Sequence, residues 1–246
     1  MKKKSKEVLV EHYNRIFCVE DNHIINEFAE AVNLLLYGKT EEEQIEKRFE
    51  YIVSLLKKDM KSVREYELLY SMYMTDTIAH SLNVALISHE IAKRMGLSKK
   101  ECDTATMCGL MHDIGKLAVS DHVLRKSGPL TEKERQEVEL HPIKGYEVLL
   151  QTKLNTHVRN TALMHHERVD GSGYPYGTNL EHIDIYARIV AIADVYDAMT
   201  MDRVYRKALP PAEAMAQIKK DRAKYDPDVY SAFMDYVEEQ LHEIAI

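Results

Sequence analysis

The chain has 246 residues, 45% hydrophobic and 30% charged, which is enough for one large domain, or one domain plus a smaller appendage, around a sizeable core. The formal net charge is -7, and the one notable basic cluster, residues 2–4, is too short to form a nucleic-acid surface. No run approaches the roughly 18 apolar residues of a membrane span, and acidic residues interrupt the basic N-terminus, so we expect no signal peptide. These features exclude a nucleic-acid polymer as partner and a membrane span, and they predict a small-molecule partner.

The three cysteines, Cys18, Cys102 and Cys108, lack CxxC spacing and lie in apolar contexts with helical periodicity. We therefore expect reduced core residues, and neither metal ligands nor disulfides. Together with the expected lack of a signal peptide, reduced cysteines predict a cytoplasmic location.

Residues 1–74 are predicted to form an N-terminal helical region, with a second domain at 75–246. Their apolar periodicity favours four amphipathic helices, which we place at 5–17, 23–36, 41–58 and 60–74. The apolar face of this region either packs on the following domain or pairs with a second copy in a homodimer. The sequence leaves both alternatives open.

From residue 75 onward, polar side chains able to bind metal interrupt the apolar faces of the predicted helices. Asp76 and His80 lie four residues apart at the start of a helix that runs to about residue 95, so both point to one side of it. Gly96 is expected to end this helix.

The next predicted helix, about 99–114, ends with His112 and Asp113, and Gly115 is expected to terminate it. Lys116 follows one turn beyond. An isolated His-Asp pair is more often a capping Asp beside a core histidine. Here further His and Asp residues recur at intervals that suit successive helices, which favours a metal site.

Three more histidines follow. His141 precedes a proline that reads as the first residue of a helix, which places it at a helix entrance. His165 and His166 fall within a helix predicted at 157–168. The segment 170–177 is too rich in Gly and Pro for a helix or strand, so we expect a shaped loop beside these histidines.

The helix predicted at 184–200 is apolar nearly all round and should be central, yet it contains Asp194. An unpaired carboxylate there would cost several kcal/mol, so a cation must lie close to it. The alternative to a metal ion is a salt bridge to Arg188 or Arg203.

Taken together, these motifs resemble the HD-GYP domains, a branch of the HD phosphohydrolase superfamily. The matching pieces are His80-Ser81, the HDIGK at 112–116, His141-Pro142, His165-His166-Glu167, the DGSGYP at 170–175, and the stretch 193–198 with Arg203 and Tyr205-Arg206 after it. The resemblance covers about 75–235 and implies an all-α, HD-type helical bundle with an N-terminal helical extension. It further implies a metal-dependent phosphodiesterase that hydrolyses cyclic di-GMP to pGpG or onward to GMP.

The chemistry of the residues agrees with a metal centre. Seven positions supply five imidazoles and two carboxylates without a thiolate, a set that suits iron or manganese and is compatible with zinc, nickel or magnesium in purified material. These positions are His80, His112, Asp113, His141, His165, His166 and Asp194. That is more than one ion needs, and by resemblance Asp113 bridges two ions that convert a shared water into the attacking hydroxide. The resemblance also implies a third divalent ion, because family members of a three-metal type carry a Glu where Asp76 stands; the alternative is that Asp76 caps its helix.

A phosphodiester also needs its developing charge neutralised and its leaving oxygen protonated. Lys116 can do one or both, and Arg203 and Arg206 can bind phosphate oxygens. Gly173 allows a close backbone approach and Tyr174 offers a face for a guanine. The alternatives are a solvated arginine pair and a loop that is only a packed turn.

Two positions depart from the family pattern. Asn83 stands where the family commonly has Arg, and Val204 stands where Pro is usual. Other functions considered are an HD-type phosphohydrolase acting on another nucleotide, such as cyclic GMP-AMP, (p)ppGpp or a deoxynucleoside triphosphate, and a catalytically silent module that binds the cyclic dinucleotide. The second usually requires lost ligands, and none is lost here.

Overall fold

The chain divides into two compact units, Met1–Ala79 and His80–Ile246, in this computed structural model. The residues described are 76–124, 126–201 and 208–244, with positions 27, 28, 30–32, 34, 47, 48, 51, 52 and 54; side chains are not described for 76–79 and 242–244. The described positions within the predicted helices 23–36 and 41–58 are helical, whereas 5–17 and 60–74 lie outside the described residues. The domain division at 74/75 and the homodimer stay predictions.

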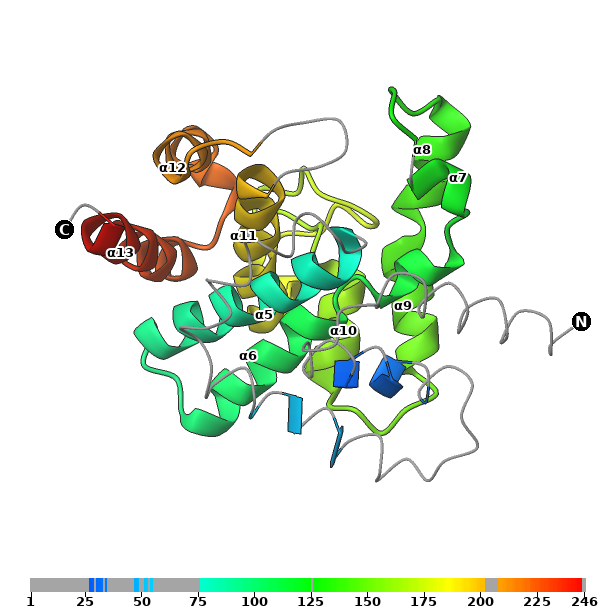
Figure 1. Ribbon diagram of the computed structural model, residues 1–246, viewed down its shortest axis with the longest axis horizontal. Helices are drawn as coiled ribbons and strands as arrows, with labels where there is room; N and C mark the ends of the chain where they lie inside the picture. Colours follow the sequence, from blue (N-terminus) through cyan, green and yellow to red (C-terminus); the bar gives the residue numbers. More distant parts are fainter. Residues whose placement is uncertain are drawn as a thin grey trace, which may run out of the picture. The chain divides into compact units, whose positions relative to one another are not determined.

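The second unit is built from helices, which confirms the all-α prediction (Figure 1). Among the described residues the only β pairing is an isolated bridge between Asp170 and Asn179, and no helix there is long and apolar enough to cross a membrane. The α-helices are α5 Asp76–Arg94, α6 Lys99–Met111, α7 Asp121–Leu124, α8 Glu132–Glu139, α9 His141–Leu149, α10 Thr156–Met164, α11 Ile185–Thr200, α12 Pro211–Lys220 and α13 Pro227–Ile244. Three short 3₁₀ helices join them: η1 Ile114–Ala118, η2 Leu180–His182 and η3 Arg222–Lys224.

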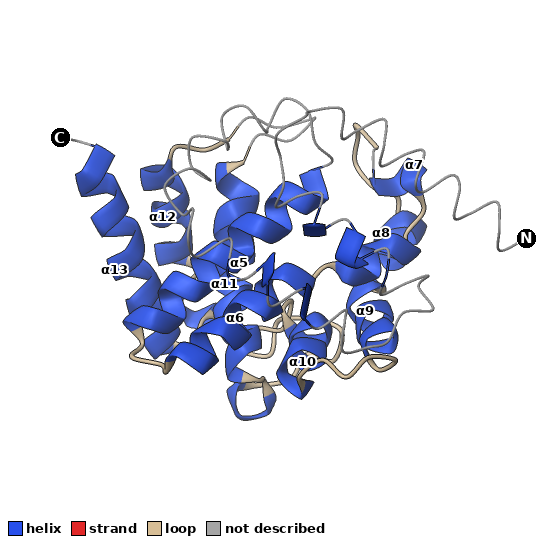
Figure 2. Cartoon of the chain, turned by 60° about the horizontal axis from the view of Figure 1, so that its bottom comes forward, coloured by secondary structure: helices blue, strands red, loops and turns tan. Residues whose placement is uncertain are grey.

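Helix α11 is the central helix of this unit, as its apolar sequence predicts. It packs against α6, α10, α12 and α13, and Ile189, Val190 and Ile192 are fully buried. Figures 1 and 2 show α12 and α13 at one end of the unit and α7, α8 and α9 at the other. Because α11 is covered on several sides, its one internal carboxylate pair, Asp194 and Asp197, is buried as well.

The ends of several helices follow from local signals. Gly96 adopts φ 76° after α5, and the amides of Gly96 and Leu97 donate to the carbonyls of Lys93 and Ala92 at 3.0 and 3.1 Å. This is the Schellman arrangement that a glycine after a helix favours, and it confirms the predicted end of α5. Capping boxes then begin α6 (Ser98 with Glu101) and α8 (Thr131 with Glu134).

Helix α6 ends earlier than predicted, and Gly115 does not terminate it. The α-helix stops at Met111, His112 and Asp113 form a turn, and Gly115 lies inside η1 with a negative φ. A Cβ at Gly115 would lie 1.9 Å from the His141 carbonyl oxygen, which no side chain can tolerate. This glycine is therefore required by the close packing of η1 on α9.

Helix α10 is also shorter than the predicted 157–168, since it runs from Thr156 to Met164 and leaves His165 and His166 in the following turn. The Nδ1–H of His165 donates to the Ala162 carbonyl at 3.0 Å. The imidazole thus occupies the Ala162 carbonyl, which would otherwise be available for a backbone hydrogen bond that continues the helix. By contrast, α9 begins at His141 with Pro142 in its first turn, so the predicted helix entrance is confirmed.

Candidate metal centre

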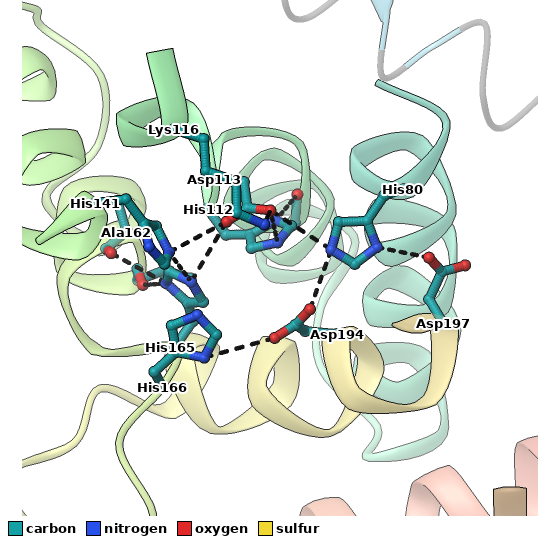
Figure 3. Close-up of polar contacts among 12 residues, drawn as sticks. His80, His112, Asp113, Lys116, His141, Ala162, His165, His166, Asp194 and Asp197 are labelled. Carbon is teal, nitrogen blue, oxygen red and sulfur yellow. Dashed lines mark hydrogen bonds and ion pairs between the residues drawn. The ribbon is translucent and has the colours of Figure 1, made fainter. Parts of the chain in front are cut away.

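Seven side chains that the sequence marks as prospective metal ligands meet inside the second unit (Figure 3). They come from separate elements: His80 from α5, His112 and Asp113 from the turn after α6, His141 from the start of α9, His165 and His166 from the turn after α10, and Asp194 from α11. All are buried except His166, which is partly exposed. Helix ends therefore supply most of the cluster.

Asp113 stands between two groups of these side chains. Its Oδ2 atom is 3.3 Å from His112 Nε2 and 3.6 Å from His80 Nε2. Its Oδ1 atom is 3.3 Å from His141 Nε2 and 3.8 Å from His165 Nε2. Each carboxylate oxygen thus faces a different set of imidazoles, which is the disposition of a carboxylate able to bridge two ions.

Each group could hold one ion. One group consists of His80, His112 and Asp194, and the other of His141, His165 and His166; within each, the ligand atoms lie within 4.8 Å of one another. The two groups also approach each other at a second point, where His166 Nδ1 lies 3.8 Å from Asp194 Oδ2.

Backbone carbonyls orient three of the histidines. Nδ1–H donates to the carbonyl three residues earlier in each case: His112 to Gly109 at 2.7 Å, His141 to Val138 at 2.7 Å, and His165 to Ala162 at 3.0 Å. Because a carbonyl can only accept, Nδ1 carries the proton and Nε2 keeps its lone pair turned toward the cluster. A hydrogen bond from the ring nitrogen that does not face the metal is the usual support of a metal-binding histidine.

The donor atoms fit a divalent cation. His80 Nε2, His112 Nε2 and Asp113 Oδ1 are buried without a hydrogen-bond partner, a state that costs about 1–3 kcal/mol for each group. His80 Nε2 pairs with Asp194 Oδ1 at 3.0 Å, so the cost falls chiefly on His112 Nε2 and Asp113 Oδ1. A cation bound by these atoms would remove the cost.

The pair His141 and His165 gives a second test of the fit. Their Nε2 atoms are 3.2 Å apart, and both imidazoles already donate from Nδ1. Two lone pairs facing one another repel, whereas two nitrogens each about 2.1 Å from one ion, at right angles, lie about 3.0 Å apart. The spacing therefore suits a shared ion.

Electrostatics leave the carboxylates charged. Burial would raise the pKa of Asp113, but Lys116 and His112 outweigh it and hold this pKa well below its usual value. Burial is likewise outweighed at Asp194, where His80 lowers the pKa. Burial lowers the pKa of His166 to about 3 and that of His165 as well, so both present neutral imidazoles, the form that binds metal.

His80 behaves differently from these two histidines. Burial would lower its pKa, but its contacts with Asp194 and Asp197 outweigh this effect and raise the pKa to about 9. In the metal-free protein an incoming cation must therefore displace a proton from His80.

Arg188 does not form the salt bridge to Asp194 that is the alternative to a metal ion. That guanidinium binds Asp226 Oδ2 at 3.1 Å and the carbonyls of Leu180 and Ile183 at 2.6 and 2.8 Å. Arg203, the other candidate partner, lies outside the described residues. Asp194 instead faces His80 and His166.

Lys116 lies at the edge of the cluster, as predicted. It is half-buried in η1, and its Nζ contacts Asp113 Oδ2 (Figure 3). A cation so placed is close to any group that Asp113 helps to bind.

The loop at 170–177 lies against the cluster through Gly173 and Tyr174. A Cβ at Gly173 would lie 2.4 Å from Glu167 Cα and from the His166 carbonyl oxygen, so the close approach that this glycine permits is to the chain's own backbone. The Tyr174 ring stacks on the His166 imidazole, with ring centres 4.6 Å apart and planes 23° apart. One face of Tyr174 is thus covered by a prospective ligand.

Two residues that matter here were not among the predicted site residues. Glu167 is buried, and its carboxylate accepts from the backbone amides of Tyr176 at 2.7 Å and Thr178 at 3.1 Å, which fixes the loop. Asp197 accepts from His80 Nδ1 at 2.6 Å. A signal existed for both: Glu167 follows the His-His pair directly, and Asp197 lies one helical turn after Asp194.

Three predicted site residues cannot be placed. Arg203 and Arg206 lie outside the described residues, and so does the side chain of Asp76, although the backbone of Asp76 begins α5. Their roles stay predictions.

The second unit is thus a helical domain with a buried cluster of histidines and aspartates, centred on a His-Asp pair, that could hold metal. The family described as HD domain matches residues 42–229. The chain therefore belongs to the HD domain family, as the motif resemblance predicts.

Known relatives carry phosphodiesterase names. Over 162 residues the chain is 40% identical to the cyclic di-GMP phosphodiesterase PA4108 of Pseudomonas aeruginosa, a match covering 65% of this chain and 39% of that protein. Over 157 residues it is 34% identical to the 3'3'-cGAMP-specific phosphodiesterase 3 of Vibrio cholerae serotype O1, with 63% and 34% covered. The chain thus spans well under half the length of these two relatives.

The fold also matches a solved structure. Bd1817, a HDG"Y"P protein from Bdellovibrio bacteriovorus, superposes with a TM-score of 0.67 at 17% identity, covering 92% of this chain and 76% of that chain. At this identity the likeness shows the all-helical fold alone.

Proposed function

We propose that this chain is a cyclic di-GMP phosphodiesterase that gives pGpG, GMP or both, with two divalent ions and Asp76 available for a third. The observation that carries the proposal is the position of Asp113, whose two oxygens face separate groups of imidazoles. The name of the Pseudomonas aeruginosa relative supports the substrate. Iron or manganese suits the nitrogen and oxygen donors best, and zinc is compatible with them.

The prospective ligands are proposed to bind two ions in two groups that share Asp113. His80, His112 and Asp194 would hold one ion, His141, His165 and His166 the other, and Asp113 both. When bound, two divalent ions lower the pKa of water toward neutrality and polarise phosphoryl oxygens. The chain's part is to hold its donors in a buried setting, where charge interactions are stronger than in water.

Lys116 is proposed as the acid or electrostatic stabiliser. Its ammonium contacts Asp113 Oδ2 and is partly exposed, so a bound phosphodiester can reach it from solvent. In that position it can donate a proton to the leaving oxygen and offset the charge that develops on the phosphate.

The substrate contacts are proposed from the motifs. Arg203 and Arg206 would bind phosphate oxygens as guanidinium forks. Tyr174 would present its remaining face to a guanine, on a loop that Gly173 and Glu167 hold against the His166 turn. A cytoplasmic location and pairing of two copies through residues 1–74 complete the proposal.

A second substrate has a specific observation in its favour. The Vibrio cholerae relative, 34% identical over 157 residues, is named for 3'3'-cGAMP, and this nucleotide has the same bridged phosphodiesters. The silent-module alternative has less support, because all seven prospective ligands are present and brought together.

Turnover by protein purified without oxygen and reloaded with Fe²⁺ or Mn²⁺ tests the proposal. Cyclic di-GMP, 3'3'-cGAMP and ppGpp are supplied separately and products are separated by chromatography. We expect pGpG or GMP from cyclic di-GMP, loss of turnover after chelation, and full turnover in His157→Gln, a histidine whose partner is Asp184. Hydrolysis of ppGpp alone, or binding of cyclic di-GMP without hydrolysis at full metal content, contradicts the proposal.

A further inference from the structure

The two groups of prospective ligands carry different charges. His80, His112 and Asp194 include a carboxylate, whereas His141, His165 and His166 are imidazoles only. Asp113 offers one oxygen to each group, and Asp194 lies closer to the first group, at 3.0 Å from His80 Nε2, than to the second, at 3.8 Å from His166 Nδ1, so the difference remains. A divalent ion beside the first group therefore meets more negative charge.

A second carboxylate, that of Asp197, contacts His80 and adds to this difference in charge between the two groups. Asp197 Oδ2 lies 2.6 Å from His80 Nδ1, while Asp194 Oδ1 lies 3.0 Å from His80 Nε2. The imidazole is thus held between two carboxylates of α11, and Asp197 lies on the side away from Asp113 (Figure 3). The side chains of His80 and Asp197 are only 6% and 3% exposed, so water screens the contact little.

The other oriented histidines have no such carboxylate at Nδ1. His112, His141 and His165 all donate to neutral backbone carbonyls. A carboxylate acceptor fixes the ring as a carbonyl does, and it also makes the opposite nitrogen a stronger donor to a cation. Among the histidines of the cluster that are fixed through Nδ1, His80 alone is supported in this way.

We propose that Asp197 is a positioning residue that turns His80 Nε2 toward the cluster, and that it makes the position of His80, His112 and Asp194 the tighter of the two divalent-ion positions. The proposal rests on the metal centre of the proposed function and not on its substrate. The ion beside His141, His165 and His166 is the one that leaves first.

Titration of metal-free protein with Mn²⁺, followed by calorimetry, tests the proposal without substrate. The wild-type protein is expected to show two binding events with different Kd values. Asp197→Asn keeps the size of the side chain and an oxygen acceptor but removes the charge. This variant should weaken the tighter event by about 10–100-fold, the usual effect of losing an outer partner of a ligand, and leave the weaker event unchanged.

Asp184→Asn, at the N-cap of α11, is the matched control. Asp184 precedes α11 and accepts from His157 Nδ1 at 2.7 Å, a His-Asp pair outside the cluster. Asparagine also caps helices well, so both Mn²⁺ Kd values should match the wild type.

Crystals grown with one equivalent of Mn²⁺ show which position fills first, even if Asp197→Asn does not fold. We expect one anomalous peak beside His80, His112 and Asp194 in the wild-type protein. First occupation of the other position, equal Kd values in the wild type, or an Asp197→Asn protein with unchanged or equally weakened events overturns the proposal. A protein that binds Mn²⁺ as expected but hydrolyses no cyclic dinucleotide would overturn the proposed function alone.

Discussion

The two sides of Asp113 are built differently. On one side His80 and Asp194 project from within α5 and α11, and Asp197 supports His80 with a further carboxylate. On the other side His141 stands at the first residue of α9, and His165 and His166 lie in the turn after α10. On the first, helical side only His112 lies at a helix end, and the ligands include a carboxylate; on the second, neutral side all three ligands lie at helix ends and are imidazoles.

The neutral side is also the one that the loop reaches. Tyr174 stacks on His166, and Glu167 binds the amides of Tyr176 and Thr178. Charge can thus retain an ion on the helical side, while the loop shapes the surroundings of the neutral side, where Tyr174 is proposed to contact a base. Holding metal and contacting substrate thus fall on different sides of Asp113, and five substitutions test that separation.

Asp113→Ala should have the largest effect, because it removes the carboxylate that both sides share. We expect hydrolysis to fall to the detection limit and metal content to drop, since two ions would face one another with less negative charge between them. Metal analysis and turnover of cyclic di-GMP measure both effects, and circular dichroism checks that the helices remain. Near-normal turnover in this variant would rule out two ions sharing Asp113.

Lys116→Ala should keep the ions on both sides and slow the chemical step by roughly 10²-fold or more, because it removes an acid or a stabilising charge. Single-turnover rates with parallel metal analysis measure this. Lys144→Ala is a matched control, since Lys144 also pairs with a carboxylate three residues away, Glu147 at 2.9 Å, but on the exposed surface. Loss of metal from Lys116→Ala would show that this lysine supports the ions.

Arg203→Ala and Arg206→Ala should change neither side of the centre and raise KM about tenfold or more, the expected loss of a charge-assisted hydrogen bond to phosphate. Steady-state kinetics at full metal occupancy measure this. Arg159→Ala, a partly exposed residue of α10, controls for the loss of a positive charge. Unchanged kinetic constants in both variants would make the arginines surface residues.

Tyr174→Ala should have the smallest effect and act on the neutral side alone. Loss of the ring that packs on His166 and is proposed to contact the substrate is expected to cost about 1 kcal/mol, roughly a fivefold fall in kcat/KM. Tyr174→Phe keeps the ring and should retain near wild-type values, and Tyr176→Ala, in the same loop but 65% exposed, serves as control. Equal losses in Tyr174→Ala and Tyr176→Ala would assign the effect to the loop backbone.

Much of the helical frame is predictable because its signals are local. Gly96 ends α5, and the apolar sequence of 184–200 makes α11 central with a buried Asp194, as the structure confirms. Gly115 misleads, because a glycine needed for contact with α9 looks in sequence like one that ends a helix.

The arrangement of the ligands is less accessible from sequence. The motifs predict that the seven prospective ligands meet in one site. They do not predict which ligands form each of the two groups, because that depends on how α5, α9, α10 and α11 pack. The contact of Asp197 with His80 is not predicted from the sequence for the same reason, because the two residues are 117 positions apart. The carbonyls that orient His112, His141 and His165 appear only once the ends of the preceding helices are known.

Anomalous scattering at the iron and manganese edges from crystals of the metal-loaded protein tests most directly whether Asp113 joins two metal positions. We expect two peaks, one beside His80, His112 and Asp194 and one beside His141, His165 and His166, with one oxygen of Asp113 directed at each. A further peak within coordination distance of Asp76 and His80 separately tests the third ion. A single peak, or two peaks of which only one contacts Asp113, would contradict the claim that this aspartate joins two metal positions.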